Sequence, residues 1–179
     1  GTDTVAAWSA YGKLDAIFWM VSGAIGISIT TFVGQNYGAR KYDRVHKSVR
    51  ICLGIDSIIS VILIVFLMLF RVPLFRLFTQ DPSVIRIGSD MLALITPCYI
   101  FFVFIEVLAG ALRGMGDVMI PTLITLLGVC VLRLIWIAVV LQISPTVNAI
   151  IYSYPVTWIA TAVLFIIYYL YKKKRILKS

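Results

Sequence analysis

Five long apolar stretches constrain the fold of this chain more than any other feature of its sequence. They run over residues 5–33, 49–70, 91–112, 118–143 and 149–171. About 20 apolar residues in a helix cross a hydrocarbon core about 30 Å thick, so each stretch is long enough to span a membrane. The sequence therefore predicts an all-α, polytopic membrane protein with five transmembrane helices.

Composition narrows the functional classes. Hydrophobic residues make up 61% of the chain and charged residues only 13%, against about a quarter charged in soluble domains. The net charge of +8 does not indicate nucleic-acid binding, because the cations lie in loops between apolar stretches rather than on one soluble face. The single histidine, His46, lies in a basic loop, where we expect a solvated side chain and no metal site. Cys52, Cys98 and Cys130 are widely spaced within apolar stretches and predict no disulfide framework.

Basic residues predict how the chain is oriented. Cytoplasmic loops carry an excess of Lys and Arg. With five crossings, eleven cations fall on one side and three, Arg71, Arg76 and Arg86, on the other. We therefore expect a multi-pass protein of the plasma membrane with its N-terminus outside and a cytoplasmic basic tail over residues 172–179. The eleven cations are Arg40, Lys41, Arg44, Lys47, Arg50, Arg113, Lys172, Lys173, Lys174, Arg175 and Lys178.

Small residues and prolines predict local structure along the spans. Ser22, Gly23, Gly26 and Ser28 would allow another helix to approach the first span closely. The run from Gly34 to Gly38 predicts the end of that helix. Asp81 before Pro82 predicts a capped helix start, and Ser144-Pro145 a helix end. Pro97 and Pro155 predict interruptions of the third and fifth spans.

Charges inside the spans are candidate functional residues, because they are costly in a bilayer and tend to mark ion or substrate pathways. Asp56 and Glu106 lie at similar depths from the basic end, by a rise of about 1.5 Å per residue. Arg133 lies at the height of Lys13, Asp15 and Tyr99, and we expect a structural pair between Asp15 and Arg133. Tyr99, Phe102 and Glu106 share one helix face. Candidates for ion coupling or substrate binding are therefore Glu106, Asp56, Tyr99 and Phe102.

Three ordered motifs resemble the multidrug and toxic compound extrusion (MATE) transporters. The first is Ala6-Ala7-Trp8 followed by Lys13 and Asp15, which is similar to the opening of that family's eighth helix. The second resembles its GQN-x-GA segment: Gly34, Gln35, Asn36, Gly38 and Ala39. The third resembles its LRG-x-GD junction between helices ten and eleven: Arg113, Gly114, Gly116, Asp117 and Pro121. Arg133 also falls where an eleventh-helix arginine is usual in the family.

The resemblance implies a twelve-helix transporter of two lobes, of which residues 1–179 would supply spans eight to twelve of the C-terminal lobe. It implies a secondary antiporter that exports organic cations or other amphiphilic drugs in exchange for Na⁺ or H⁺, with no further cofactor. Expected partners are membrane lipids and the N-terminal lobe and seventh helix of the same protein. In one branch of the family a tenth-helix carboxylate couples the cation, and its position corresponds here to Phe102, one turn before Glu106.

Two alternatives stay open beside the exporter. A lipid-linked oligosaccharide flippase of the same superfamily would need a cationic cavity, whereas the spans carry acidic residues. A non-transporting membrane module or an intramembrane enzyme is the other. Intramembrane catalysis usually needs a nucleophile with a base, or paired metal ligands, and no histidine lies in any predicted span. The sequence therefore predicts a transporter and not an enzyme.

Overall fold

The computed structural model describes residues 1–144 and 146–176, and nearly all of these residues are helical. Pro145 and residues 177–179, with Lys178 and the end of the predicted basic tail, lie outside the described residues. The elements in chain order are α1 (Thr2–Gly38), α2 (Tyr42–Arg76), α3 (Pro82–Ile95), the 3₁₀ turn η1 (Thr96–Cys98), α4 (Tyr99–Gly114), α5 (Met119–Thr125), the π-helical segment η2 (Leu126–Val131), α6 (Leu132–Ile143), α7 (Val147–Ile151) and α8 (Ser153–Ile176).

These elements join into five helices that are long and apolar enough to cross a membrane: Thr2–Gly38, Tyr42–Arg76, Pro82–Gly114, Met119–Ile143 and Val147–Arg175. Each predicted apolar stretch falls on one of them, to within a residue. The fold class expected from the sequence is therefore confirmed.

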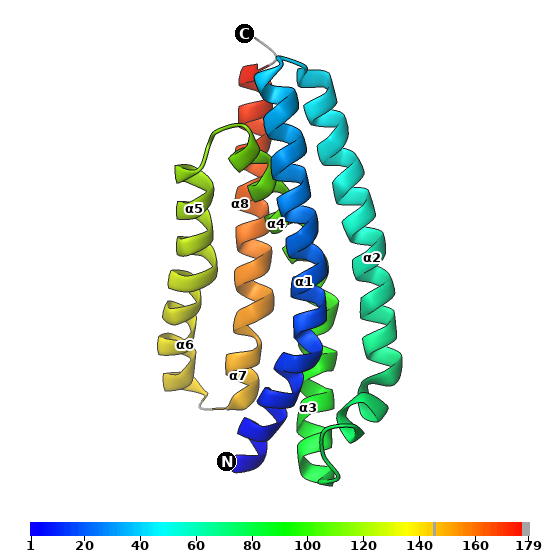
Figure 1. The fold of residues 1–179 in the computed structure, drawn as a ribbon. Helices are drawn as coiled ribbons and strands as arrows, with labels where there is room; N and C mark the ends of the chain where they lie inside the picture. The colour runs from blue at the N-terminus through cyan, green and yellow to red at the C-terminus, as the bar shows by residue number, and fades with distance from the viewer. Residues whose placement is uncertain (145, 177–179) are drawn as a thin grey trace.

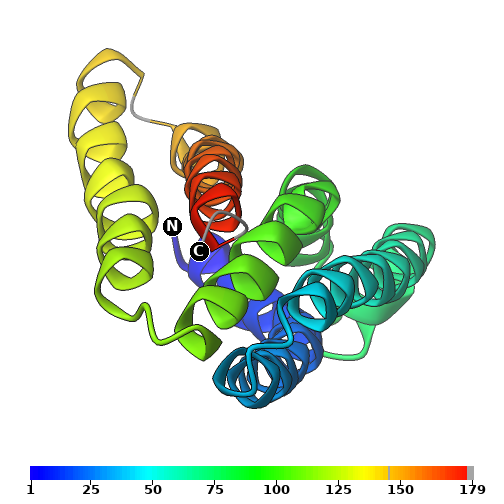
Figure 2. The same ribbon diagram turned by 90° about the horizontal axis from the view of Figure 1, so that it is seen from above.

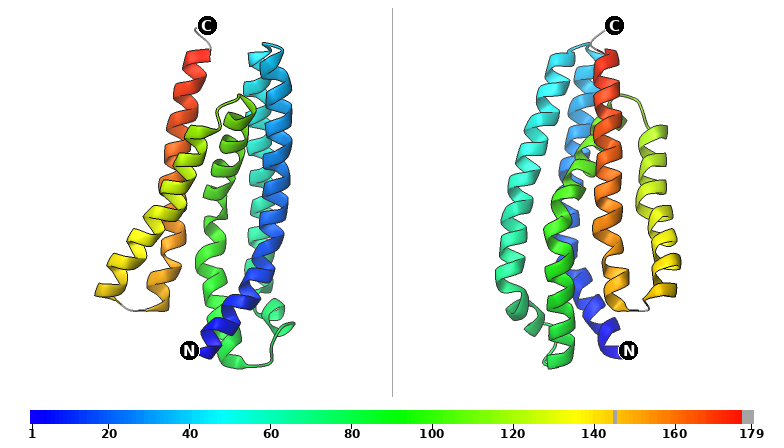
Figure 3. Two further views of the ribbon diagram at one scale, coloured as in Figure 1. Left: turned by 60° about the vertical axis from the view of Figure 1, so that its left-hand side comes forward. Right: turned by 180° about the vertical axis from the view of Figure 1, so that it is seen from behind.

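α1 and α4 form the centre of the bundle. α1 packs against α2, α3 and α4, and α4 also contacts α2 and α8. α5, η2 and α6 contact α4, α7 and α8, and in Figures 2 and 3 they stand to one side of the other helices. The buried hydrophobic core consequently follows α1, α4 and α8 and includes Phe18, Tyr99 and Trp158.

The two ends of the bundle differ in charge. The C-terminal end of α8 lies beside the turn between α1 and α2 (Figure 1). The basic residues of segments 40–50 and 172–175 therefore gather at one end. The N-terminus and the turn between α2 and α3 lie at the opposite end.

Several local predictions are confirmed. Asp81 caps α3, since its carboxylate accepts from the backbone N–H of Ser83 at 2.8 Å, and Pro82 occupies the first turn. Pro97 lies in the 3₁₀ turn that separates α3 from α4. The fifth span is interrupted at Tyr152, between α7 and α8. Pro97 lies within the first interruption, whereas Pro155 lies three residues after the second, where it has no N–H to donate to the carbonyl of Ile151.

The predicted end of α1 within the run from Gly34 to Gly38 is confirmed. α1 continues through Gly38, and the chain turns at Arg40, which has a φ of 57°. The amide of Lys41 donates to the carbonyl of Asn36 at 2.8 Å and that of Arg40 to Tyr37 at 3.0 Å. This is the Schellman arrangement, in which the left-handed residue follows the last helical turn. α1 therefore ends just before Arg40, and no glycine of the run adopts the left-handed conformation.

Candidate functional site

α1 and α4 cross at very short range because both carry small residues at the contact. A Cβ added to Gly110 would lie 2.6 Å from the carbonyl oxygen of Gly26, and one added to Gly114 would lie 2.5 Å from that of Thr30. The hydroxyl of Thr30 donates across the interface to the Gly110 carbonyl at 3.0 Å. Gly110 and Gly114 thus form the small-xxx-small pattern that lets helix backbones meet in lipid.

Only part of the small-residue stripe predicted on α1 takes part in this contact. Ser22 and Gly26 are buried against other helices. Gly23 has no atom within 4 Å of an added Cβ, and Ser28 is exposed. The stripe is therefore split between an inner face and an outer face, which composition alone does not distinguish.

The Glu106 carboxyl occupies a notch at Gly26. A Cβ on Gly26 would overlap the Glu106 side chain. Arg113, two turns further along α4, donates to Glu106 Oε1 at 3.3 Å, and the Glu106 side chain is 23% exposed. The carboxyl is thus held between a glycine on one helix and an arginine on its own helix.

Asp56 is the most deeply buried carboxyl of the described chain, with 0% of its surface exposed. Its Oδ2 accepts from the Ser22 hydroxyl at 3.1 Å. Its Oδ1 has no hydrogen-bond partner among the described residues. Ser22 lies one helical turn before Gly26, so Asp56 from α2 and Glu106 from α4 meet neighbouring turns of α1. The structure therefore brings these two predicted residues together.

Asp15 lies in a second polar cluster, nearer the N-terminal end of the bundle. Its carboxylate accepts from the hydroxyls of Tyr11, at 3.3 Å, and Tyr99, and from the indole N–H of Trp19. The two tyrosine hydroxyls are 3.1 Å apart. Three aromatic donors on two helices thus converge on one carboxylate.

The predicted structural pair of Asp15 with Arg133 or Lys13 is wrong. The guanidinium of Arg133 lies 3.9 Å from the centre of the Tyr154 ring and donates to the Thr157 hydroxyl at 3.2 Å. Lys13 points instead toward Phe78, 5.3 Å from its ring centre. Because aromatic donors satisfy Asp15 and an aromatic face receives Arg133, neither charge requires the other.

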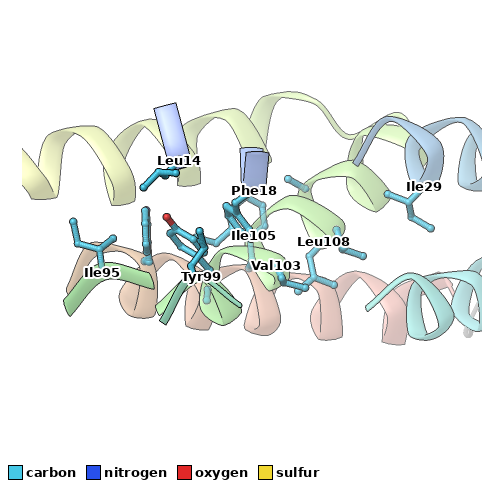
Figure 4. Packing of buried hydrophobic residues seen from close by; sticks show 14 of the residues in the cluster. Leu14, Phe18, Ile29, Ile95, Tyr99, Val103, Ile105 and Leu108 are labelled. Atoms are coloured by element: carbon cyan, nitrogen blue, oxygen red, sulfur yellow. The ribbon is translucent and has the colours of Figure 1, made fainter. Parts of the chain in front are cut away.

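Aromatic rings line the region between the two polar clusters. Phe18 stacks on Tyr99 with ring centres 4.1 Å apart (Figure 4). Phe102, which is half-buried, meets Trp19 edge-on at 4.4 Å, and Trp158 of α8 lies 5.8 Å from Phe102. Trp158, Trp19 and Tyr154 were not predicted as site residues. Three of the four tryptophans of this chain gather here, since Trp19 lies 6.0 Å from Trp158 and Trp8 lies 5.8 Å from Tyr154, and they are the signal that could have identified the region.

His46 is not the solvated residue that its position in a basic loop predicts. It is 7% exposed, and its Nδ1 lies 3.1 Å from the Tyr169 hydroxyl on α8. The loop is short because α2 begins at Tyr42, so His46 is already in the second turn of a packed helix.

The family motif at the turn after α4 fixes that turn to α8. Asp117 accepts from the ammonium of Lys172 at 2.8 Å and from the Tyr168 hydroxyl. Burial acts to raise the pKa of Asp117, but the hydrogen bonds from Lys172 and Tyr168 outweigh it and hold that pKa below its usual value. Gly116 supplies the positive φ of 82° that the turn needs.

The other motif residues serve the same junction. Gly34 approaches the Gly114 carbonyl, at 3.4 Å from an added Cβ. Asn36 is buried and donates to the Phe32 carbonyl at 2.8 Å, whereas Gln35, Gly38 and Ala39 are exposed. Pro121 is buried in the first turn of α5. The second and third motifs thus coincide with the contacts of α4 with α1 and α5 at the basic end, whereas the first motif lies toward the N-terminal end.

Comparison with known proteins agrees with this architecture. Residues 1–139 match the family MatE. The chain is 32% identical over 124 residues to a probable multidrug resistance protein NorM of Aromatoleum aromaticum, covering 69% of this chain and 27% of that protein. It is 23% identical over 129 residues to a probable multidrug resistance protein YoeA of Bacillus subtilis, covering 72% of this chain and 28% of that protein.

A solved structure extends the likeness to the whole fold. The outward-facing conformation of a multidrug resistance MATE family transporter of the MOP superfamily superposes with a TM-score of 0.91 at 14% identity, covering 100% of this chain and 40% of that structure. The chain spans about a quarter of the length of the curated relatives that it matches. The sequence match to the family and the five-helix fold together establish that this chain belongs to the MatE family of membrane transporters.

Proposed function

We propose that the chain forms part of a secondary antiporter that exports organic cations or other amphiphilic drugs in exchange for Na⁺ or H⁺ across the plasma membrane. Members of the family are transporters and not enzymes, which makes transport the relevant class of activity. The proposal assigns the coupling of the cation to Glu106 and Asp56. The observation that carries it is the Asp56 carboxyl, fully buried with one oxygen lacking a partner among the described residues.

Electrostatics explains why such a group suits ion coupling. Burying an unpaired charge costs several kcal/mol, so a buried carboxyl either takes up a proton or meets a cation. Asp56 has one hydroxyl donor, Ser22, and Glu106 has one partly exposed arginine. Both carboxyls therefore keep capacity for a proton or a cation, whereas Asp15 is already held by three donors.

The aromatic region around Asp15 supports an organic cation as substrate. Aromatic faces and a carboxylate attract organic cations together, by about 0.5 to 2 kcal/mol per cation–π contact. Tyr99, Phe102 and Trp158 supply such rings beside Asp15. An organic cation would approach these rings from the side of Phe102, because the Phe102 side chain is only half-buried.

Mutation of the two acids in the protein at its full native length tests the proposal. Glu106→Gln and Asp56→Asn should abolish ethidium efflux driven by a Na⁺ or proton gradient in proteoliposomes, while both proteins still reach the membrane. Asp43→Asn, at an exposed acid of the same helix as Asp56, is the matched control and should transport like wild type. Undiminished efflux in both acid variants would refute the coupling role.

The proposal also includes the orientation, with the N-terminus outside and the C-terminus in the cytoplasm. The gathering of basic residues at the C-terminal end supports it. In a background without native cysteines, a cysteine at exposed Lys174 should react with an impermeant maleimide only from the cytoplasmic side, and one at Gln80 only from outside. Labelling of Lys174→Cys only from outside and of Gln80→Cys only from the cytoplasmic side would contradict the proposed orientation.

A further inference from the structure

A groove between α2 and α3 carries two of the three arginines found at the N-terminal end of the bundle, away from the acids and aromatic rings described above. The groove has a volume of about 470 Å³ and is larger than the pocket between α4 and α5, which measures about 310 Å³. It is lined by Val72, Arg76, Gln80, Pro82, Ile85, Arg86 and Ser89. We propose that this groove binds the phosphate of an anionic phospholipid headgroup.

The charges of the groove fit a phosphate. Arg76 from the last turn of α2 and Arg86 from the second turn of α3 approach it from two helices, and no acidic residue lines it. Neither arginine forms an ion pair within the described residues, where the ion pairs are Arg113 with Glu106 and Lys172 with Asp117. Arg86 also borders a neighbouring pocket that contains Asp90. Two guanidinium groups present planar donor pairs, the geometry that recognises phosphate oxygens.

The polar and apolar parts of the lining match a lipid rather than a free anion. Gln80 adds a side-chain amide near the end of the helix pair. Val72, one turn further into the bundle than Arg76, and Ile85, next to Arg86, supply apolar surface for the start of an acyl chain. In such a groove the guanidinium groups would hold the headgroup phosphate while the apolar surface contacts the start of an acyl chain, a combination that inorganic phosphate cannot use.

Packing next to the groove holds it in shape before any ligand binds. The ring of Phe75 is fully buried and fills the space that a Cβ on Gly88 would need. The Asp81 carboxylate fixes the start of α3 through its bond to Ser83 at 2.8 Å. Because Arg76 follows Phe75 directly and Arg86 lies two residues before Gly88, this contact sets the relative position of the two arginines. A preformed site loses less conformational entropy on binding.

Lipid titration of the protein at its full native length, purified in detergent, tests the proposal. Phosphatidylglycerol in mixed micelles should raise the unfolding midpoint in a saturable way, and native mass spectrometry should detect the retained lipid. Phosphatidylcholine and inorganic phosphate at the same concentrations should not do so. Arg76→Gln with Arg86→Gln should weaken phosphatidylglycerol binding at least about tenfold, because the charged hydrogen bonds of both guanidinium groups to the phosphate are lost.

The third arginine of this end provides the matched control. Arg71→Gln removes the same charge on α2 without touching the groove, and it should bind phosphatidylglycerol like wild type. If the double variant does not fold, Arg86→Gln alone should still weaken binding. Equal binding by the groove variants and wild type, an equal loss in Arg71→Gln, or an equal midpoint shift with inorganic phosphate would each overturn the assignment.

Discussion

The helix that contains α4 and the helix formed by α5, η2 and α6 are both apolar enough to cross a membrane but differ sharply in how they pack. Half of the most apolar stretch of Pro82–Gly114 is buried, against 6% of that of Met119–Ile143. α4 meets α1 through glycines and a backbone-directed hydroxyl, whereas α6 has no buried residue among those described. Hydropathy therefore places both helices in the membrane without indicating which of them forms the protein core.

α5, η2 and α6 are attached to the rest of the bundle at a few specific points. Gly128 leaves room for the Thr161 side chain, Arg133 reaches Tyr154 and Thr157, and the Trp136 indole donates to the Ala149 carbonyl at 3.0 Å. Most of their large side chains are exposed, including Leu126, Leu134 and Val139. This helix is therefore positioned by polar and small-residue contacts with α7 and α8, not by an extensive apolar core.

The largest effect should follow from breaking the α1–α4 contact. Gly110→Val would place a branched side chain against the Gly26 carbonyl and Ile29. Overpacking of this kind costs about 1 to 3 kcal/mol and more where backbone blocks relaxation, so the thermal midpoint in detergent should fall by several degrees or the protein should fail to fold. Gly54→Val on α2, where an added Cβ meets nothing within 4 Å, should leave the midpoint near that of wild type. Equal thermal midpoints for Gly110→Val and Gly54→Val would show that the α1–α4 contact is no more tightly packed than the open position on α2.

A smaller effect should follow from Gly128→Ala in η2. The new methyl group would overlap the hydroxyl and β-carbon of Thr161, so α8 and η2 must separate or Thr161 must rotate. We expect a loss of about 1 kcal/mol in the free energy of unfolding. Gly12→Ala, at an open position of α1, is the control and should be neutral or slightly stabilising. A fall as large as that of Gly110→Val would show that the two regions are equally tightly packed.

The smallest effect should come from the ion pair that fixes the turn before α5 to α8. Asp117→Asn should cost about 1 kcal/mol at neutral pH, because Lys172 is partly exposed and solvent screens the pair. The lowered pKa of Asp117 means that the pair stabilises the fold above the ordinary carboxyl pKa and is lost as pH falls through the lowered value. Wild type and variant should therefore converge in stability only in acid. A difference that persists unchanged in acid would contradict the ion-pair account.

Most of the fold was predictable because its signals are local. Apolar length identified five helices, and Asp81 with Pro82 identified the start of the third. The left-handed turn at Arg40 and the π-helical segment at Leu126 were not predicted. Both depend on hydrogen bonds and tertiary contacts that residue types do not encode.

The candidate site was predictable in depth but not in rotation. The rise per residue placed Asp56 and Glu106 at similar heights, and the structure brings both to neighbouring turns of α1. The same reasoning placed Arg133 at the height of Asp15, yet Arg133 turns to Tyr154. Height along a helix follows from residue number, whereas the partner of a side chain depends on how the helices are rotated and on which competing aromatic faces lie nearby.

The notch at Gly26 is the point where the tight α1–α4 contact meets the proposed coupling site, and its mutation tests the account most directly. Cation-driven efflux per mole of folded protein should be measured for Gly26→Ala and for Gly23→Ala, one turn earlier on the open side of α1. The account predicts that Gly26→Ala, which displaces the Glu106 carboxyl, loses most of its transport while Gly23→Ala transports like wild type. Equal, undiminished efflux in both variants would contradict it.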